Sequence, residues 1–184
     1  KLCLSDFISQ TKFTNYELIE MHAGEEFKNI KTCEMIWHKL TEKGADRNSI
    51  LINLGGGVVC DLGGFVACTF KRGIEFINVP TSLLAMVDAS VGGKNGIDLG
   101  MLKNQIGVIR DPLQVIVDTS FLKTLPENEA LSGYAEMLKH GLIHSVGYWN
   151  AVQKFDSSNP ASEKKLIWES ILIKNEVVTE DPFE

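Results

Sequence analysis

The sequence lacks several features that identify common classes of protein. Its apolar runs are far too short to cross a membrane, and 18 Lys and Arg residues stand against 24 Asp and Glu residues. This acidic balance argues against nucleic acid as the main partner, but it allows a local basic pocket for a small phosphorylated substrate. A GxSxG elbow, a Walker A motif and internal repeats are also absent. We therefore expect a cytoplasmic protein with no nucleic-acid or membrane partner.

Cysteine is scarce and shows no metal-binding spacing. The four cysteines, Cys3, Cys33, Cys60 and Cys68, form no CxxC pair. A zinc ribbon and a thioredoxin-type redox motif are thereby excluded. We interpret the four residues as reduced, buried, small hydrophobic side chains of a cytosolic protein.

The stretch ILINLGGGVVCDLGGF, residues 50–65, organises the chain. An apolar strand at residues 50–54 leads into the glycine turn (residues 55–57), and a helical pattern opens at Asp61. This arrangement brings backbone N–H groups close to a phosphate, which favours dinucleotide binding. An ordinary tight turn, with Asp61 as a helix cap, is the alternative. Glu75 is either the acidic residue for a ribose hydroxyl or an ordinary exposed strand residue.

The order of the expected elements predicts an α/β fold. The predicted fold is a Rossmann-like parallel sheet domain at residues 1–126, followed by the start of an all-helical domain at residues 127–184. We expect the chain to be incomplete at both ends, because it begins without Met and stops directly after a helical pattern. The predicted strands are residues 16–21, 50–54, 74–79 and 114–118. The first predicted helix has Glu25 and Glu26 in its first turn and Gly44 as its C-cap, and the other predicted helices are residues 61–70, 81–91, 127–145, 148–155 and 161–180.

A glycine-rich stretch at residues 92–104 carries charged and amide side chains. We expect an irregular, functional loop there, because so many glycines disfavour regular structure. Asp88, Lys94, Lys103 and Asn104 could together hold a polyhydroxylated anion, since a lysine ammonium suits phosphate or carboxylate. A solvated loop with surface lysines explains the same residues equally well.

The helix predicted at residues 127–145 places Glu136 and Lys139 on one face. Spacing alone favours a salt bridge between them. His140 and His144 continue this face, but eight helical residues rise about 12 Å, so at most one adjacent pair could share a metal, with further ligands from elsewhere. Otherwise both are partly exposed helix residues. Three leucines, Leu131, Leu138 and Leu142, are expected to face the core.

Five stretches together resemble the 3-dehydroquinate synthase family. They are LGGGVVCDLGGF, KRGIEFINVPTSLLAMVDASVGGKNGID, LKNQIG, FLKTLP and YAEMLKHG, in an order and spacing that fit from Gly24 to about Gly141. The resemblance implies a homodimeric lyase of the shikimate pathway that depends on NAD and on a divalent metal, zinc or cobalt. Its implied substrate is the phosphorylated sugar acid 3-deoxy-D-arabino-heptulosonate 7-phosphate, and its products are 3-dehydroquinate and phosphate.

The same resemblance assigns roles to individual residues. Asp88, Lys94, Lys103, Asn104 and Lys139 match the substrate pocket, Arg72 matches an arginine that reaches the neighbour's substrate phosphate in the family's dimer, and Glu136 matches one metal ligand. The implied contacts of NAD are Glu25, Lys28, Gly56, Gly57, Val58, Val59, Cys60, Asp61, Thr81, Ser82, Lys94, Lys103, Phe121, Leu122, Lys123 and Thr124.

Departures from the family pattern are few. Cys60 stands where the family usually has glycine, and Ser82 and Asn95 stand where threonine is usual. The family's two other metal ligands, both histidines, belong to a segment that would follow this chain, and its first strand would precede it. The alternatives are another sugar phosphate cyclase such as 2-deoxy-scyllo-inosose synthase, a metal-dependent alcohol or glycerol dehydrogenase, and a nucleotide-binding regulatory module without activity.

Overall fold

A parallel sheet lies at the centre of the computed structural model, which describes residues 2–181. Its order is β1 (Ile50–Gly55), β2 (Glu75–Pro80) and β5 (Gln114–Val115). Ile50 pairs with Glu75 and Gly55 pairs with Pro80, so both long strands end at the same edge. The predicted α/β fold with a parallel sheet is confirmed. Residues that follow β1 and β2 therefore meet at one edge, which is where ligands bind in open parallel sheets.

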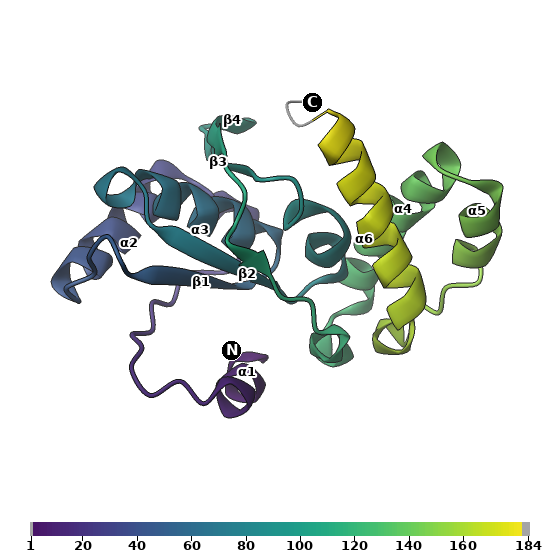
Figure 1. Cartoon of the computed structure of the whole chain (residues 1–184), viewed down its shortest axis with the longest axis horizontal. Helices are drawn as coiled ribbons and strands as arrows, with labels where there is room; N and C mark the ends of the chain where they lie inside the picture. The colour runs from purple at the N-terminus through teal and green to yellow at the C-terminus, as the bar shows by residue number, and fades with distance from the viewer. Residues whose placement is uncertain (1, 182–184) are drawn as a thin grey trace.

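Two helices cover one face of this sheet. They are α2 (Ile30–Glu42) and α3 (Gly57–Thr69), and α1 (Leu4–Thr11) lies on the other side of β1 (Figure 1). Cys33 of α2, Leu62 and Val66 of α3 and Phe76 of β2 form the first hydrophobic core. The periodic apolar residues of α2 were therefore a correct indication of a core-facing helix.

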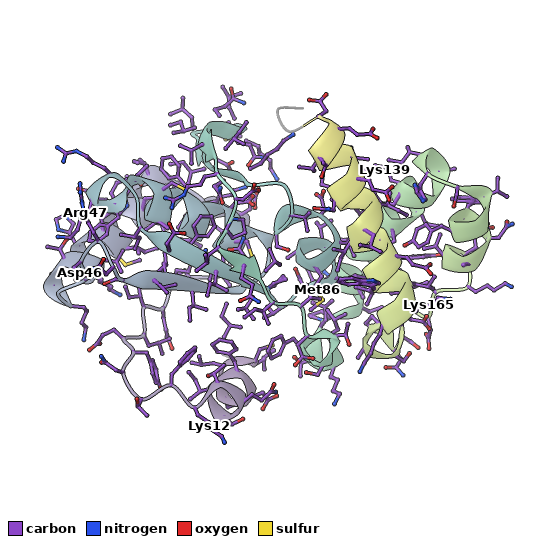
Figure 2. The ribbon with its side chains drawn as sticks, in the orientation of Figure 1. Lys12, Asp46, Arg47, Met86, Lys139 and Lys165 are labelled. Atoms are coloured by element: carbon purple, nitrogen blue, oxygen red, sulfur yellow. The ribbon has the colours of Figure 1, made fainter. Side chains whose placement is uncertain are left out.

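Three further helices follow Pro126. They are α4 (Glu127–Ile143), α5 (Val146–Val152) and α6 (Lys164–Glu180). The second core joins them to the sheet part, because it contains Val79 and Met86 as well as Met137 and Ile167. Figure 2 shows Met86 between the sheet and α6. Among the described residues, no helix is both long and apolar enough to span a bilayer. The start of a helical part after Pro126 is thus present, and it shares a core with what precedes it.

The core-facing side of α4 differs from the prediction. Leu131 and Leu142 are exposed, whereas Gly133, Met137 and His140 are buried. The physical reason is close helix packing, because a Cβ on Gly133 would overlap the side chain of Leu83. Small residues allow that approach and bring His140 into the interior, while Leu138 is partly buried against the second core, as predicted.

The glycine-rich stretch forms a regular hairpin, which corrects the prediction of an irregular loop. Strands β3 (Lys94–Leu99) and β4 (Leu102–Ile109) are antiparallel, and Gly96 pairs with Gly107. A Cβ on Gly96 would lie 2.8 Å from the carbonyl oxygen of Ile106, so glycine here permits close pairing of the strands. Asn95 holds the hairpin base, since its Nδ2 donates to the carbonyl oxygens of Gly93 at 2.6 Å and Arg110 at 2.8 Å.

Three other predicted elements differ in extent. Residues 16–21 are not a strand, because no strand in the described part of the chain forms a β-ladder with them. The strand expected at residues 114–118 contains only two residues, and the helix expected at residues 81–91 contains the short π-helix η3 (Ala85–Ala89). Short 3-10 turns complete the fold: η1 (Glu25–Phe27), η2 (Phe70–Arg72), η4 (Thr119–Thr124) and η5 (Pro160–Ser162).

Replacing Gly64 with alanine is expected to destabilise the protein, although helix propensity alone predicts a gain of about 1 kcal/mol. A Cβ there would collide with the side-chain oxygen of buried Asn95, so we expect a net loss of about 2 kcal/mol. Urea unfolding measures the change, with Gly147→Ala in α5 as the matched control, because a Cβ there meets nothing closer than 3.9 Å. A Gly64→Ala protein as stable as wild type would contradict this packing.

Candidate functional site

The glycine turn joins the end of β1 to the start of α3. Gly56 is the N-cap of α3 and Gly57 is its first residue, so the helix begins four residues before the predicted start at Asp61. Asp61 therefore lies inside the helix, and the alternative that it caps the helix is wrong. The first N–H groups of a helix have no partner within it and favour anions. The turn is thus a suitable cradle for a phosphate.

The segment after β2 packs directly against this turn. The N–H of Thr81 donates to the carbonyl oxygen of Gly55 at 2.8 Å. A Cβ on Gly56 would lie 3.2 Å from Ser82 Oγ, and one on Gly57 would lie 3.3 Å from Ala89 Cβ. Side chains at these two positions would fill the space beside the turn, so glycine keeps the backbone accessible there.

A buried lysine connects three segments that are distant in the sequence. Lys28 is only 3 % exposed, and its Nζ lies 2.6 Å from Asp61 Oδ2 and 2.6 Å from Asn104 Oδ1. The backbone N–H of Asn104, a residue with a left-handed φ of 54°, donates to Asp98 Oδ1 at 2.8 Å. Burial raises the pKa of Asp61, and the Lys28 ammonium opposes that rise. Lys28 therefore fixes the hairpin against the start of α3.

A cavity of about 510 Å³ opens between the start of α3, η3, the hairpin and α6. It brings together Asp61, Asp88, Lys94 and Asn104, four of the residues predicted for the site. Val91, Asn95, Gly96, Gly107, Val108, Ile109, Ala89 and Lys174 complete its lining. Lys94 and Asn104 are exposed side chains, and together with Asp88 they line one concave surface, which supports the interpretation of an anion site.

Lys174 is a residue of this cavity that the sequence analysis missed. Its Nζ lies 2.7 Å from Asp88 Oδ1, and both side chains are partly exposed. Lys174 lies within the long helix α6, among residues with no motif or unusual spacing. Only the packing of α6 against η3, visible as the closeness of the two ribbons in Figure 1, places it here. No pattern in the sequence identifies Lys174, because its place in the cavity depends on how α6 packs in three dimensions.

Several predicted residues lie outside the cavity. Lys103 is 70 % exposed and pairs with Glu25 at 3.1 Å. Arg72 follows the far end of α3, and a 13-residue helix is about 20 Å long, so Arg72 is remote from the glycine turn. Phe121 and Leu122 in η4 are buried in the second core, so their side chains are unavailable to a ligand.

Glu75 lies at the wrong end of the sheet for a ribose contact. It opens β2, whereas the glycine turn follows the last residue of β1, opposite Pro80. Its carboxylate is paired with Arg110 Nη2 at 2.7 Å. Glu75 is therefore the ordinary strand residue of the two interpretations.

A second polar group lies on α4. Lys139 forms a salt bridge with Glu136, as the spacing predicts, and His140 Nε2 lies 3.4 Å from Glu136 Oε1. Figure 2 shows Lys139 in the helical part, beside α6. Burial lowers the pKa of His140, and the neighbouring Glu136 carboxylate opposes that shift. His144 is separate, because it faces Glu176 at 3.7 Å.

The described residues do not form a complete metal site. Within residues 2–181, no three His, Cys, Asp or Glu side chains are grouped so that they could hold an ion. Glu136 offers a carboxylate that is 16 % exposed, and beside it His140 Nε2 is a buried polar atom without a hydrogen-bond partner among the described residues. Glu136 could therefore supply one ligand to a divalent metal, but the described residues do not supply a whole coordination shell.

The cysteines agree only in part with the prediction. All four are free thiols; Cys33 and Cys60 are buried, whereas Cys3 and Cys68 are half-buried. Burial raises the pKa of Cys33 and of Cys60 to about 12, so neither is a reactive thiolate. Cys60 lies in the first part of α3, directly beside Asp61, and its side chain is buried.

Comparisons with known proteins agree with this geometry. A curated 3-dehydroquinate synthase from Parabacteroides distasonis is 47% identical over 174 residues, which are 94% of this chain and 49% of that relative. The chain thus spans about half the length of this relative. A solved 2-deoxy-scyllo-inosose synthase, complexed with carbaglucose-6-phosphate, NAD+ and Co2+, is 28% identical with a TM-score of 0.81, over 91% of this chain and 47% of that one.

A second solved structure supports the fold alone. It is 2-epi-5-epi-valiolone synthase from Streptomyces hygroscopicus with NAD+ and Zn2+ bound, 23% identical with a TM-score of 0.87, over 98% of this chain and 52% of that one. The model of the 3-dehydroquinate synthase N-terminal family matches residues 18–132, a span that includes the glycine turn, Lys28 and the hairpin. The chain belongs to the 3-dehydroquinate synthase family.

Proposed function

We propose that this chain supplies the NAD-binding part and one wall of the substrate pocket of a 3-dehydroquinate synthase. The reaction is the conversion of 3-deoxy-D-arabino-heptulosonate 7-phosphate to 3-dehydroquinate and phosphate, in the shikimate pathway. The observation that carries the proposal is the cavity beside the glycine turn, where Asp88, Lys94, Asn104 and Lys174 converge from η3, the hairpin and α6. The family of the chain supports the choice of reaction.

The glycine turn fits the pyrophosphate of NAD. Its backbone is accessible, as the absence of a Cβ at Gly56 and Gly57 ensures, and the N-terminus of α3 favours negative charge. We assign to the cofactor the residues from Gly56 to Asp61, together with Glu25, Lys28, Thr81 and Ser82. Lys94 and Lys103 would contact the cofactor from the hairpin. Lys123 and Thr124 of η4 are further proposed contacts of NAD. Phe121 and Leu122 could contact it through their backbone alone, because their side chains are buried.

The charged lining of the cavity fits a phosphorylated sugar acid. Lys94 and Lys174 provide two ammonium groups for carboxylate or phosphate, and Asp88 and Asn104 accept hydrogen bonds from hydroxyls. Lys139 would reach the substrate from α4 once its pairing with Glu136 is exchanged. Arg72 is too remote to act in its own pocket, so we infer that it serves the pocket of a second copy in a homodimer.

Glu136 is the proposed ligand of a divalent metal, zinc or cobalt. Its carboxylate is 16 % exposed and lies next to His140 Nε2, and the remaining ligands would come from outside the described residues, since the relatives are about twice as long. When bound, NAD would take up and return a hydride at a substrate carbon, and the metal would polarise the hydroxyl and carbonyl oxygens. The lysines and Asn104 orient the substrate, and its own departing phosphate can carry a proton away.

Replacing Gly56 with valine is expected to weaken NAD binding at least tenfold. The backbone angles of Gly56 suit any residue, so the loss would come from the added side chain between the turn and Ser82. Isothermal titration of the intact protein with NAD measures the change, and Gly147→Ala serves as the control variant. Unaltered affinity for NAD in Gly56→Val would contradict the placement of the cofactor at this turn.

The choice of substrate tests the proposed reaction against the nearest alternative. We expect the intact protein, with NAD and Co2+ or Zn2+, to release phosphate from the heptulosonate phosphate and not from glucose 6-phosphate. Release only from glucose 6-phosphate would instead favour an activity like that of the inosose synthase neighbour. NAD binding without phosphate release from either sugar would favour the regulatory module.

A further inference from the structure

His140 is a buried histidine to which the sequence assigns no role in the reaction. It is 1 % exposed and lies in the last turn of α4. Histidine is seldom placed so deep in a protein without partners for both ring nitrogens, because an unpaired buried polar atom costs about 1–3 kcal/mol. The partners of its two nitrogens therefore decide what it does.

One ring nitrogen has a firm partner in another helix. Nδ1 lies 2.7 Å from Oγ of Ser170, which is fully buried in α6. The imidazole ring is thus held in place by α6.

The other ring nitrogen faces Glu136. Nε2 lies 3.4 Å from Glu136 Oε1, and it has no hydrogen-bond partner among the described residues. A bare nitrogen lone pair would repel the carboxylate, whereas an N–H would attract it. The Nε2–H tautomer is therefore favoured, with Nδ1 as acceptor of the Ser170 hydroxyl proton. In this state an imidazole N–H lies 3.4 Å from the proposed metal ligand, and a small turn of the Glu136 carboxylate would align the two as a hydrogen bond.

We propose that His140 is a positioning residue, which uses Nε2–H to hold one oxygen of the Glu136 carboxylate so that the other is directed to the metal. The inference rests on the proposed function, in which Glu136 is a metal ligand. Lys139 holds the same carboxylate from the solvent side, and it is more than half exposed, so it can turn to the substrate. His140 cannot leave, because Ser170 anchors it. The carboxylate would then keep its orientation when Lys139 is engaged elsewhere.

Carboxylate ligands are generally oriented by a hydrogen bond from behind, and loss of such a partner typically costs 10–100-fold in metal affinity. The intact protein is titrated with Zn2+ and Co2+ as wild type and as His140→Phe, which keeps the ring volume but removes the donor. We expect the dissociation constant to rise about 10–100-fold in His140→Phe. His140→Gln, which can place an amide N–H near the Nε2 position, is expected to restore most of the affinity. NAD affinity should be unchanged in both.

A second measurement needs no metal and no variant of His140. In the 15N-labelled protein, long-range proton–nitrogen spectra should show His140 as the Nε2–H tautomer, with its Nε2 proton shifted strongly downfield by the carboxylate. Glu136→Gln should move that proton upfield. A bare Nε2, or a proton indifferent to Glu136→Gln, would overturn the inference even if the His140 variants fail to fold.

The outcomes separate this inference from the proposed function. If wild type binds no divalent metal, the metal role of Glu136 fails, while the nitrogen spectra still decide whether His140 holds its carboxylate. If wild type binds metal and folded His140→Phe binds it equally well, His140 is only a core residue and the inference is wrong. If His140→Phe binds the metal more weakly and His140→Gln restores the affinity, the results support both the metal role of Glu136 and the positioning role of His140.

Discussion

Replacing Lys94 with alanine in the intact enzyme is expected to lower the rate of phosphate release by roughly 100-fold or more, because a charge-assisted contact to a bound anion is lost. Lys94 lines the cavity from the hairpin, opposite the pair of Asp88 with Lys174. Without the Lys94 ammonium, the carboxylates of Asp61 and Asp88 outweigh the ammonium of Lys174 in the cavity lining. An anionic substrate would therefore be bound poorly. Steady-state phosphate release with saturating NAD and metal measures the effect.

A matched lysine distinguishes the pocket from the general charge of the protein. Lys165 of α6 is 88 % exposed and has only a 3.8 Å pairing with Glu169 (Figure 2). Lys165→Ala changes the net charge by the same amount and is expected to keep near-normal turnover. Near-normal turnover of Lys94→Ala would remove Lys94 from the substrate pocket, and with it the main reason for regarding the hairpin as a wall of the site.

Replacing Lys28 with methionine is expected to destabilise the protein by about 3 kcal/mol, because it leaves the Asp61 carboxylate, only 19 % exposed, without its partner. The amide oxygen of Asn104 loses its donor in the same change. We also expect the affinity for NAD to fall, since the hairpin would no longer be fixed against the start of α3. Urea unfolding monitored by circular dichroism measures the stability.

A double variant isolates the charge from the packing. Lys28→Met combined with Asp61→Leu removes both charges at once, and replacing a buried ion pair with apolar residues is often neutral. We expect this protein to recover most of the lost stability without recovering NAD binding. If Lys28→Met alone were as stable as wild type, the ion pair would not join the hairpin to α3, and the account of the site's architecture would be wrong.

The elements that could be predicted are those with a strong local pattern. The strand before the glycine turn, the helix after it and the amphipathic α2 follow from apolar periodicity, and the salt bridge of Glu136 with Lys139 follows from helical spacing. The grouping of Asp88, Lys94 and Asn104 was one of two open interpretations. The cavity supports the grouping, which depends on contacts among η3, the hairpin and α6 that no local pattern contains.

The failures share a physical cause, which is that packing overrides local preference. Glycines at residues 92–107 disfavour a strand in isolation, but Gly96 against Gly107 allows two strands to approach closely. Leucines on α4 favour burial in isolation, but Gly133 and His140 take the interior face because Leu83 approaches there. Lys174 had no signal at all, since its role depends only on where α6 packs.

The most direct test follows phosphate and NADH together in one reaction of the intact protein with the heptulosonate phosphate, NAD and a divalent metal. Our account predicts phosphate release over many turnovers with no net accumulation of NADH, because each hydride taken up is returned. Net NADH formed in step with substrate loss would show a dehydrogenase of related architecture instead. That result, or a failure to release any phosphate, would contradict the assignment of this cavity to a 3-dehydroquinate synthase reaction.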